Sequence, residues 1–151
     1  MRAVVQRVIE ASVSVDDAVV GSVGRGLVAF VGVGRDDTSA DAAALAAKVA
    51  ALRIFPDDAA ATGRSVLDVG GSVLVVSQFT LLADVRKGRR PSFAAAAPPE
   101  VAEPLVEEVG RRLAGLGVPV AFGRFGASMI VEVVNDGPFT LILEVVDGKV
   151  R

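Results

Sequence analysis

Near the start of the chain, apolar and polar residues alternate with a period of two, which is the spacing of a β-strand with one buried face. The alternating segments are Val4 to Val8, Ala11 to Val15 and Ala18 to Val23, and Asp16-Asp17 has the composition of a hairpin turn between the last two. A more continuous apolar run from Gly26 to Val33 predicts a central strand. The pattern therefore predicts that the chain begins as an antiparallel sheet.

Two later segments have the spacing of helices. In the first, Thr38 and Asp41 form a plausible capping box before an apolar stripe. This stripe consists of Ala42, Leu45, Ala46, Val49 and Leu52. In the second, Pro99 suits the first turn, and Gly115 or Gly117 ends the helix. Its expected buried stripe consists of Val101, Leu105, Val109 and Leu113.

Four more strands are predicted between and after the helices. They are Ser72 to Phe79, Val118 to Phe122, Met129 to Val134 and Thr140 to Val146. The last two are joined by a loop that contains Gly137-Pro138, and residues 56–71 and 83–98 are expected to be loops as well. At 151 residues and without repeats or linkers, the whole chain, residues 1–151, is predicted to be a single domain.

The composition excludes several kinds of chemistry. The sequence contains no histidine and no cysteine, so it cannot form a Ser-His-Asp triad, a Cys-His pair or a soft metal site. No carboxylate cluster has the spacing of a metal-binding loop, and no glycine motif has the context of a dinucleotide site. We therefore expect neither a metal nor a cofactor.

Charge and hydrophobicity restrict location and partners. Charged residues interrupt every apolar run well below the ~18 residues of a membrane span. The N-terminal segment lacks the features of a signal peptide, so a cytoplasmic protein is expected. The net charge of −2 argues against a broad basic face, so any RNA contact must be local. Hydrophobic residues make up 52% of the chain, which predicts that a homodimer interface buries part of the apolar surface.

Two short motifs carry the candidate chemistry. The first, Ser77-Gln78-Phe79-Thr80-Leu81, follows an apolar run, as expected where a buried strand ends at a site. Ser77 and Thr80 are candidate nucleophiles, but the chain supplies no adjacent base, so direct attack by either is not favoured. Alternatively, their hydroxyl groups only satisfy hydrogen-bonding groups where the strand ends. The second motif, Asn135 to Thr140, contains Gly137-Pro138, which taken alone has the composition of an ordinary turn.

Together these motifs resemble those of the D-aminoacyl-tRNA deacylase family, a Ser-Gln-Phe-Thr-Leu strand end and an Asn-x-Gly-Pro-x-Thr loop. The resemblance extends over nearly the whole chain. It includes Gln6-Arg7-Val8, Ala11-Ser12-Val13, Arg53-Ile54-Phe55, Arg90-Pro91-Ser92-Phe93 and Gly123-Arg124-Phe125-Gly126-Ala127. It implies an α+β fold in which a curved, mainly antiparallel, barrel-like β-sheet is flanked by two helices, in a homodimer.

The resemblance also implies roles for the residues of the first motif. Ser77, Gln78, Phe79 and Thr80 would bind the 3′-terminal adenosine and the ester. Backbone N–H groups near Phe79 and Thr80 would stabilise the oxyanion. The neighbouring 2′-OH of the RNA would help to activate the attack, because the chain itself has no base.

Other implied substrate contacts come from distant parts of the sequence. Gly137-Pro138 would form a cis peptide, held in part by Arg7, and would reach across the dimer into the partner's pocket, where its carbonyl groups face the substituents of the Cα atom. Phe125 and Met129 would wall the adenine or ester pocket, or would belong to the core. A basic loop would contact tRNA acceptor-stem phosphates, or would simply be solvated. Its residues are Arg86, Lys87, Arg89 and Arg90.

Three positions depart from the family pattern. Ser128 stands where an aspartate is usual, and Phe139 stands where a smaller valine is usual. Residues 63–67 read Gly-Arg-Ser-Val-Leu, where Gly-Lys-Met-Asn-Leu is common. The serine and the changed loop affect local loop contacts, while Phe139 leaves Gly137-Pro138 itself unchanged.

The sequence therefore predicts an enzyme that hydrolyses the ester of D-aminoacyl-tRNA, releases the D-amino acid and rejects L-aminoacyl-tRNA through the Gly-Pro loop. Mischarged glycyl-tRNA(Ala) is an expected second substrate, because a pocket that excludes side chains on one face cannot exclude hydrogen. One alternative is the related deacylase type with a trans Gly-Pro that acts on L-alanyl-tRNA, although its strand end reads Pro-Gln-Ala-Thr. The other is a non-catalytic module that binds the tRNA 3′ end.

Overall fold

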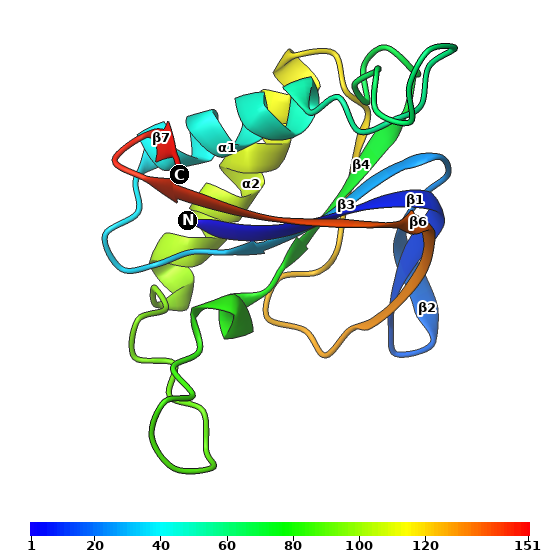
Figure 1. Cartoon of the computed structure of the whole chain (residues 1–151). Helices are drawn as coiled ribbons and strands as arrows, with labels where there is room; N and C mark the ends of the chain where they lie inside the picture. Colours follow the sequence, from blue (N-terminus) through cyan, green and yellow to red (C-terminus); the bar gives the residue numbers. More distant parts are fainter.

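The computed structural model describes residues 1–151 and contains one β-sheet, two α-helices and a short 3₁₀ helix (Figure 1). The strands are β1 (Arg2–Val15), β2 (Ala18–Val23), β3 (Gly26–Gly32), β4 (Ser72–Ser77), β5 (Val120–Phe122), β6 (Ile130–Val146) and β7 (Lys149–Val150). The helices are α1 (Ser39–Ala51), η1 (Phe79–Leu82) and α2 (Pro99–Gly115).

The sheet has the strand order β5-β4-β3-β1-β6-β7, with β2 paired to the second half of β1. The pairs β3–β4 and β4–β5 are parallel, and the other pairs are antiparallel. Parallel neighbours need a long crossover connection, and α1 and α2 lie in these two connections. Figure 1 shows both helices on one side of a sheet that curls strongly at its β2 end. The predicted curved α+β fold with two helices is therefore confirmed, and the sheet is mixed.

The two halves of strand β1 bury opposite faces. Arg7 and Val8 are both buried because they lie on opposite faces, and the pairing with β3 is regular from Arg2 to Val8. In the first half, Ala3 and Val5 belong to a cluster of 25 buried residues that includes the inner faces of both helices. In the second half, Val8 and Val13 belong to a separate cluster of 7 buried residues. An extra residue in β1, Ile9, lies between the partners of Asn135 and Val134 and keeps Val13 on the same face as Val8.

Two local predictions are confirmed in detail. Strand β2 has the predicted bounds, and the turn residues before it, Asp16 and Asp17, both have positive φ angles. The capping box of α1 is formed, because Asp41 accepts hydrogen bonds from the N–H and the hydroxyl of Thr38, at 2.8 and 2.9 Å. These features depend on neighbouring residues only, which is why the sequence reveals them.

Other bounds differ from the predictions. The two alternating segments before Asp16 are one strand, because the extra residue Ile9 shifts the alternation without ending the strand. Strand β6 is likewise continuous, so Gly137-Pro138 lies in a bulge within a strand and not in a loop between two strands. Strand β4 ends at Ser77, because Phe79 already begins η1. The central strand ends at Gly32, and β7 was not predicted at all.

The buried stripe of α2 also differs from the predicted one. The buried residues are Ala102, Val106, Val109, Gly110 and Leu113, whereas Val101 is 39% exposed and Leu105 is half-buried. A strict four-residue spacing drifts around a helix of 3.6 residues per turn, so a long stripe must mix spacings of three and four. The last strand before β6 starts at Val120, two residues later than predicted, after Pro119. No helix in the structure combines the length and apolar composition that crossing a membrane demands.

Candidate active site

The first motif lies where the central parallel strand β4 ends. Residues Val73 to Val76 are buried in the sheet between β3 and β5, and the chain then leaves the sheet at Ser77. The N–H of Gln78 donates to the carbonyl of Val31 at 2.8 Å, which holds the exit against the end of β3. Ligands of sheets with parallel strands commonly bind beyond the carboxyl ends of those strands. The motif is therefore placed at the edge where a site is expected.

A cavity of about 380 Å³ opens at this edge. Ser77, Gln78 and Phe79 line it, together with Phe125 from the segment after β5. Its remaining walls are mostly apolar residues from the end of β3, the segment before α2 and the first turns of α2. An apolar cavity with a few polar groups at one end suits a ligand with an aromatic or aliphatic part and one reacting polar group.

Backbone donors without a partner lie at the cavity, in Phe79, and next to it, in Thr80. The N–H groups of Phe79 and Thr80, at the start of η1, donate to no other backbone carbonyl. The hydroxyl of Thr80 accepts a hydrogen bond from Gln78 Nε2 at 2.5 Å. Free N–H groups at the start of a helical turn are suited to an oxygen that carries negative charge. The arrangement can stabilise an oxyanion without a histidine or a metal ion.

An aromatic pair joins the motif to the loop that follows it. The rings of Phe79 and Phe93 meet edge to face with their centroids 4.9 Å apart, and both rings line the cavity. Phe93 belongs to a segment that carries the family resemblance, but its place at the cavity was not predicted from the sequence. Nor were the places of Ala96 and Ala97, which line the cavity before α2. The sequence feature that could have indicated a cavity residue here is the aromatic side chain that follows Arg90-Pro91-Ser92.

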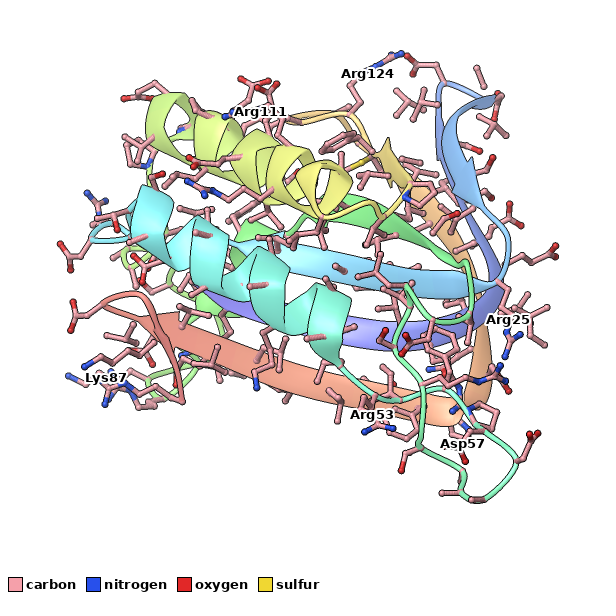
Figure 2. All side chains as sticks on the ribbon, turned by 90° about the horizontal axis from the view of Figure 1, so that it is seen from above. Arg25, Arg53, Asp57, Lys87, Arg111 and Arg124 are labelled. Atoms are coloured by element: carbon pink, nitrogen blue, oxygen red, sulfur yellow. The ribbon has the colours of Figure 1, made fainter.

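The basic loop forms a small hairpin beside the cavity. Asp84 and Ser92 close it with two backbone hydrogen bonds, of 2.7 and 2.9 Å. The Asp84 carboxylate pairs with the guanidinium of Arg86 at 2.7 Å, and this interaction lowers the pKa of Asp84. The other basic residues of the loop are exposed and form no ion pair; they are Lys87, Arg89 and Arg90. Lys87 lies at the outer edge of the molecule in Figure 2.

The second motif forms a wide bulge in β6. Four residues, Asp136 to Phe139, lie opposite the single residue Arg7 of β1, and the Gly137–Pro138 peptide is cis. The Asn135 side chain closes the bulge, because its Oδ1 accepts the N–H of Phe139 at 2.9 Å and its Nδ2 donates to Thr140 Oγ1 at 3.0 Å. The polar ends of the motif therefore hold its backbone in shape.

The two motifs lie far apart within one chain. The pairing aligns Ser77 with Val31, and Val31 with Ala3, whereas Gly137 lies opposite Arg7. Four residues along a strand span about 13 Å and three strand spacings about 14 Å, which separates the motifs by roughly 20 Å. Within one chain, the structure therefore brings Ser77 to Phe79 together with Phe125, but not with Gly137-Pro138.

The two predicted apolar wall residues have different surroundings. Phe125 lines the cavity, whereas Met129 packs against the smaller buried cluster and does not line the cavity. The Met129 sulfur lies close to Gly123, where a Cβ atom would be only 2.8 Å from it. Close contact between this thioether and the backbone explains why Gly123 suits its position.

Comparison with known proteins adds independent findings. A family model described as D-Tyr-tRNA(Tyr) deacylase matches residues 4–144. A D-aminoacyl-tRNA deacylase of Roseiflexus castenholzii is 60% identical over 144 residues, which cover 95% of this chain and 92% of the relative. Another, of Desulforudis audaxviator, is 61% identical over 144 residues, with coverages of 95% and 97%.

A solved structure has the same fold. The c-Myc DNA Unwinding Element Binding Protein superimposes with a TM-score of 0.90 at 38% identity, and the match covers 97% of this chain and 99% of that protein. The curled mixed sheet and its two helices are thus shared over nearly the full length of both chains.

Proposed function

The chain belongs to the D-Tyr-tRNA(Tyr) deacylase family of aminoacyl-tRNA hydrolases, and we propose that its active site is the cavity at the carboxyl end of β4. There it would hydrolyse the ester that joins a D-amino acid to the 3′-terminal adenosine of tRNA. The observation that carries this assignment is that Phe79, which lines the apolar cavity, and the next residue, Thr80, both have backbone N–H groups without a partner.

The proposed chemistry requires no nucleophilic side chain. Water attacks the ester carbonyl carbon, and the developing oxyanion is stabilised by the N–H groups of Phe79 and Thr80. The 2′-OH of the terminal ribose assists the attack, since the chain has no histidine or cysteine to act as a base. The Gln78–Thr80 hydrogen bond fixes the turn that presents both donors. Positioning and charge stabilisation then provide the rate enhancement.

A second copy of the chain is needed to complete this site. Gly137-Pro138 lies roughly 20 Å from the cavity in the same chain, by the spacing of the strands, so it can act only on a partner's cavity. The outward faces of β1 and β6 carry exposed apolar side chains that suit a subunit interface. They are Ile9, Ile130, Val134 and Ile142. In the proposed homodimer, each bulge would cover the partner's cavity.

The proposed role of Gly137-Pro138 is to exclude L-amino acids. Protecting L-aminoacyl-tRNA by about ten-thousand-fold needs ~5.5 kcal/mol, whereas apolar side-chain fit supplies only about 1–3 kcal/mol. A backbone wall supplies a repulsive term, because an L side chain would collide with carbonyl oxygens. Glycine has no side chain, so glycyl-tRNA(Ala) would be hydrolysed as well.

The basic loop would meet the acceptor-stem phosphates through Lys87, Arg89 and Arg90.

A parallel assay of D- and L-tyrosyl-tRNA tests the assignment. At catalytic protein concentration, we expect complete hydrolysis of the D form and glycyl-tRNA(Ala), and about ten-thousand-fold slower hydrolysis of the L form. Preferred hydrolysis of L-alanyl-tRNA would assign the chain to the trans Gly-Pro type. Binding of the tRNA 3′ end without turnover would instead identify a non-catalytic module.

A further inference from the structure

A second cavity, of about 440 Å³, adjoins the proposed active site. Ser77, Val106 and Phe125 line both cavities, so the two are adjacent beside the end of β4. The volume corresponds to roughly fifteen molecules of liquid water, which is enough for a free amino acid. Nothing in the proposed hydrolysis uses this second space.

The second cavity differs from the first in its charges. Glu103, Glu107 and Arg111 line it from successive turns of one face of α2, and Arg124 lines it from the segment after β5. Figure 2 shows Arg111 and Arg124 along the same edge of the molecule, reaching out from α2 and from the chain that follows β5. The lining therefore offers two carboxylates and two guanidinium groups.

These four charges are not neutralised within the chain. Glu107 and Arg111 have the i,i+4 spacing that favours an ion pair, yet neither forms a pair within 4.0 Å, and neither do Glu103 or Arg124.

The adjacent pair on the same helix behaves differently. Arg112 pairs with Glu108 at 2.7 Å, and Ser39 of α1 donates a hydrogen bond to the same glutamate at 2.5 Å. Glu108 and Arg112 are thus paired with each other, whereas Glu103, Glu107 and Arg111, which line the cavity, are exposed and have no ion-pair partner.

The proposed reaction creates a ligand with matching charges. In the ester, the amino acid carries an ammonium group but no carboxylate. Hydrolysis breaks the bond between the acyl carbon and the ribose 3′-oxygen, adds the water oxygen to the acyl carbon, and returns one proton to the 3′-oxygen and one to solvent. The released amino acid then carries one positive and one negative charge. Guanidinium groups bind carboxylates with paired, charge-assisted hydrogen bonds, so they distinguish the product from the ester.

We infer that the second cavity is a binding site for the free, zwitterionic amino acid after hydrolysis, with Arg111 and Arg124 receiving its carboxylate and Glu103 and Glu107 its ammonium group. This inference rests on the proposed function, because that function supplies the amino acid next to the cavity. The cavity gives the product a place to move into when it leaves the oxyanion donors. RNA is a poor occupant by comparison, because two glutamates would face its phosphates.

Binding of D-phenylalanine to the full-length protein tests the inference without RNA. Titration calorimetry or NMR should detect binding in the millimolar range. D-Phenylalaninamide, which lacks the carboxylate, and N-acetyl-D-phenylalanine, which lacks the ammonium group, should each bind at least about tenfold more weakly. The double variant Arg111→Gln, Arg124→Gln should also lose at least about tenfold in affinity for D-phenylalanine. The matched control is Arg112→Gln on the same helix, which should bind normally.

The outcomes separate this inference from the proposed function. Hydrolysis of D-phenylalanyl-tRNA is measured on the same preparations, and free D-phenylalanine should inhibit it less in the double variant than in the unaltered protein. Hydrolysis without D-phenylalanine binding at tens of millimolar, or with binding that the double variant retains, would overturn the inference alone. So would adenosine 5′-monophosphate that competes with D-phenylalanine, because the cavity would then serve the RNA. Absence of hydrolysis in the unaltered protein would contradict the proposed function.

Discussion

Arg7 and Asp136 interact through both the backbone and the side chain of the aspartate. The Nε atom of Arg7 donates to the carbonyl oxygen of Asp136 at 3.1 Å and lies 3.2 Å from its carboxylate. The Nη1 atom donates to the carbonyl of Ile54 at 2.5 Å, and the guanidinium lies 5.0 Å from the centroid of the Phe139 ring. One side chain therefore connects the Gly137-Pro138 bulge to the segment that follows α1.

Replacing Arg7 should loosen this bulge and destabilise the fold. Arg7 is only 9% exposed, so Arg7→Gln leaves buried carbonyl groups without a donor and should cost about 2–3 kcal/mol in urea unfolding. Under our proposal, it should also raise hydrolysis of L-tyrosyl-tRNA more than it lowers hydrolysis of the D form. The control is Arg112→Gln on α2, whose i,i+4 pair with Glu108 lies at the surface and should contribute less than about 1 kcal/mol. Equal effects of the two variants would contradict the role of Arg7.

The backbone donors of η1 can be tested one at a time. Phe79 is the first residue of η1, a position that accepts proline, and its N–H has no partner in the chain. Compared with Phe79→Ala, Phe79→Pro should lower kcat by a further ~100-fold to 1000-fold, because only proline removes the donor. Ser77→Ala and Thr80→Ala should keep activity within about tenfold. Loss of several orders of magnitude in either alanine variant, with tRNA binding intact, would restore a side-chain nucleophile.

The basic loop should contribute electrostatically to tRNA affinity. Lys87 and Arg89 are exposed and have no ion-pair partner, so the double variant Lys87→Gln, Arg89→Gln should reduce the slope of log affinity against log salt by about 1.5 to 2. The control is Lys48→Gln, Lys149→Gln, which changes the net charge equally at a distance from the cavity. Equal slopes in the two double variants would show that the loop is merely solvated.

The proposed dimer can be disrupted on an exposed side chain. Ile142 is 74% exposed in the single chain, so Ile142→Glu should leave the folding of each chain nearly unchanged and weaken dimer association by at least about tenfold. Hydrolysis should then fall with dilution in step with the dimer fraction measured by sedimentation. Val19→Glu, also at an exposed strand position, is the control. A monomer that keeps full selectivity for the D form would contradict a shared active site.

Acid stability should depend on Asp41. Burial of this carboxyl raises its pKa, but hydrogen bonds from the N–H groups of Gly148 and Thr38 and from the Thr38 hydroxyl lower it, and the net pKa is below the usual value. A depressed folded-state pKa stabilises the fold above the unfolded-state value of about 3.9. This stabilisation is lost as the pH falls through the folded-state pKa.

Asp41→Asn should therefore lower the free energy of unfolding at pH 7 by about 1–2 kcal/mol. The difference from the unaltered protein should shrink below pH ~4, because the unaltered carboxyl then becomes protonated as well. Urea unfolding across this range measures both effects. Asp58→Asn, at an exposed position, is the control, and a constant difference down to the lowest pH would refute the assignment.

Features that depend on neighbouring residues were visible in the sequence, and features that depend on distant contacts were not. The Thr38–Asp41 capping box and the Asp16-Asp17 turn were predicted correctly. The contact between Phe79 and Phe93 was not, because a hairpin separates the two residues and nothing local indicates that they meet. The second cavity escaped prediction for the same reason, since α2 and the segment after β5 line it together.

The extra residue Ile9 in β1 restricts how this chain can vary in length. Because it keeps Ala11 and Val13 on the same face as Val8, removing it would turn both side chains, and those that follow, to the opposite face of the sheet. Insertions and deletions among relatives should therefore avoid β1 and concentrate in residues 58–62, which are all exposed, so that the connection can change in length without altering either core.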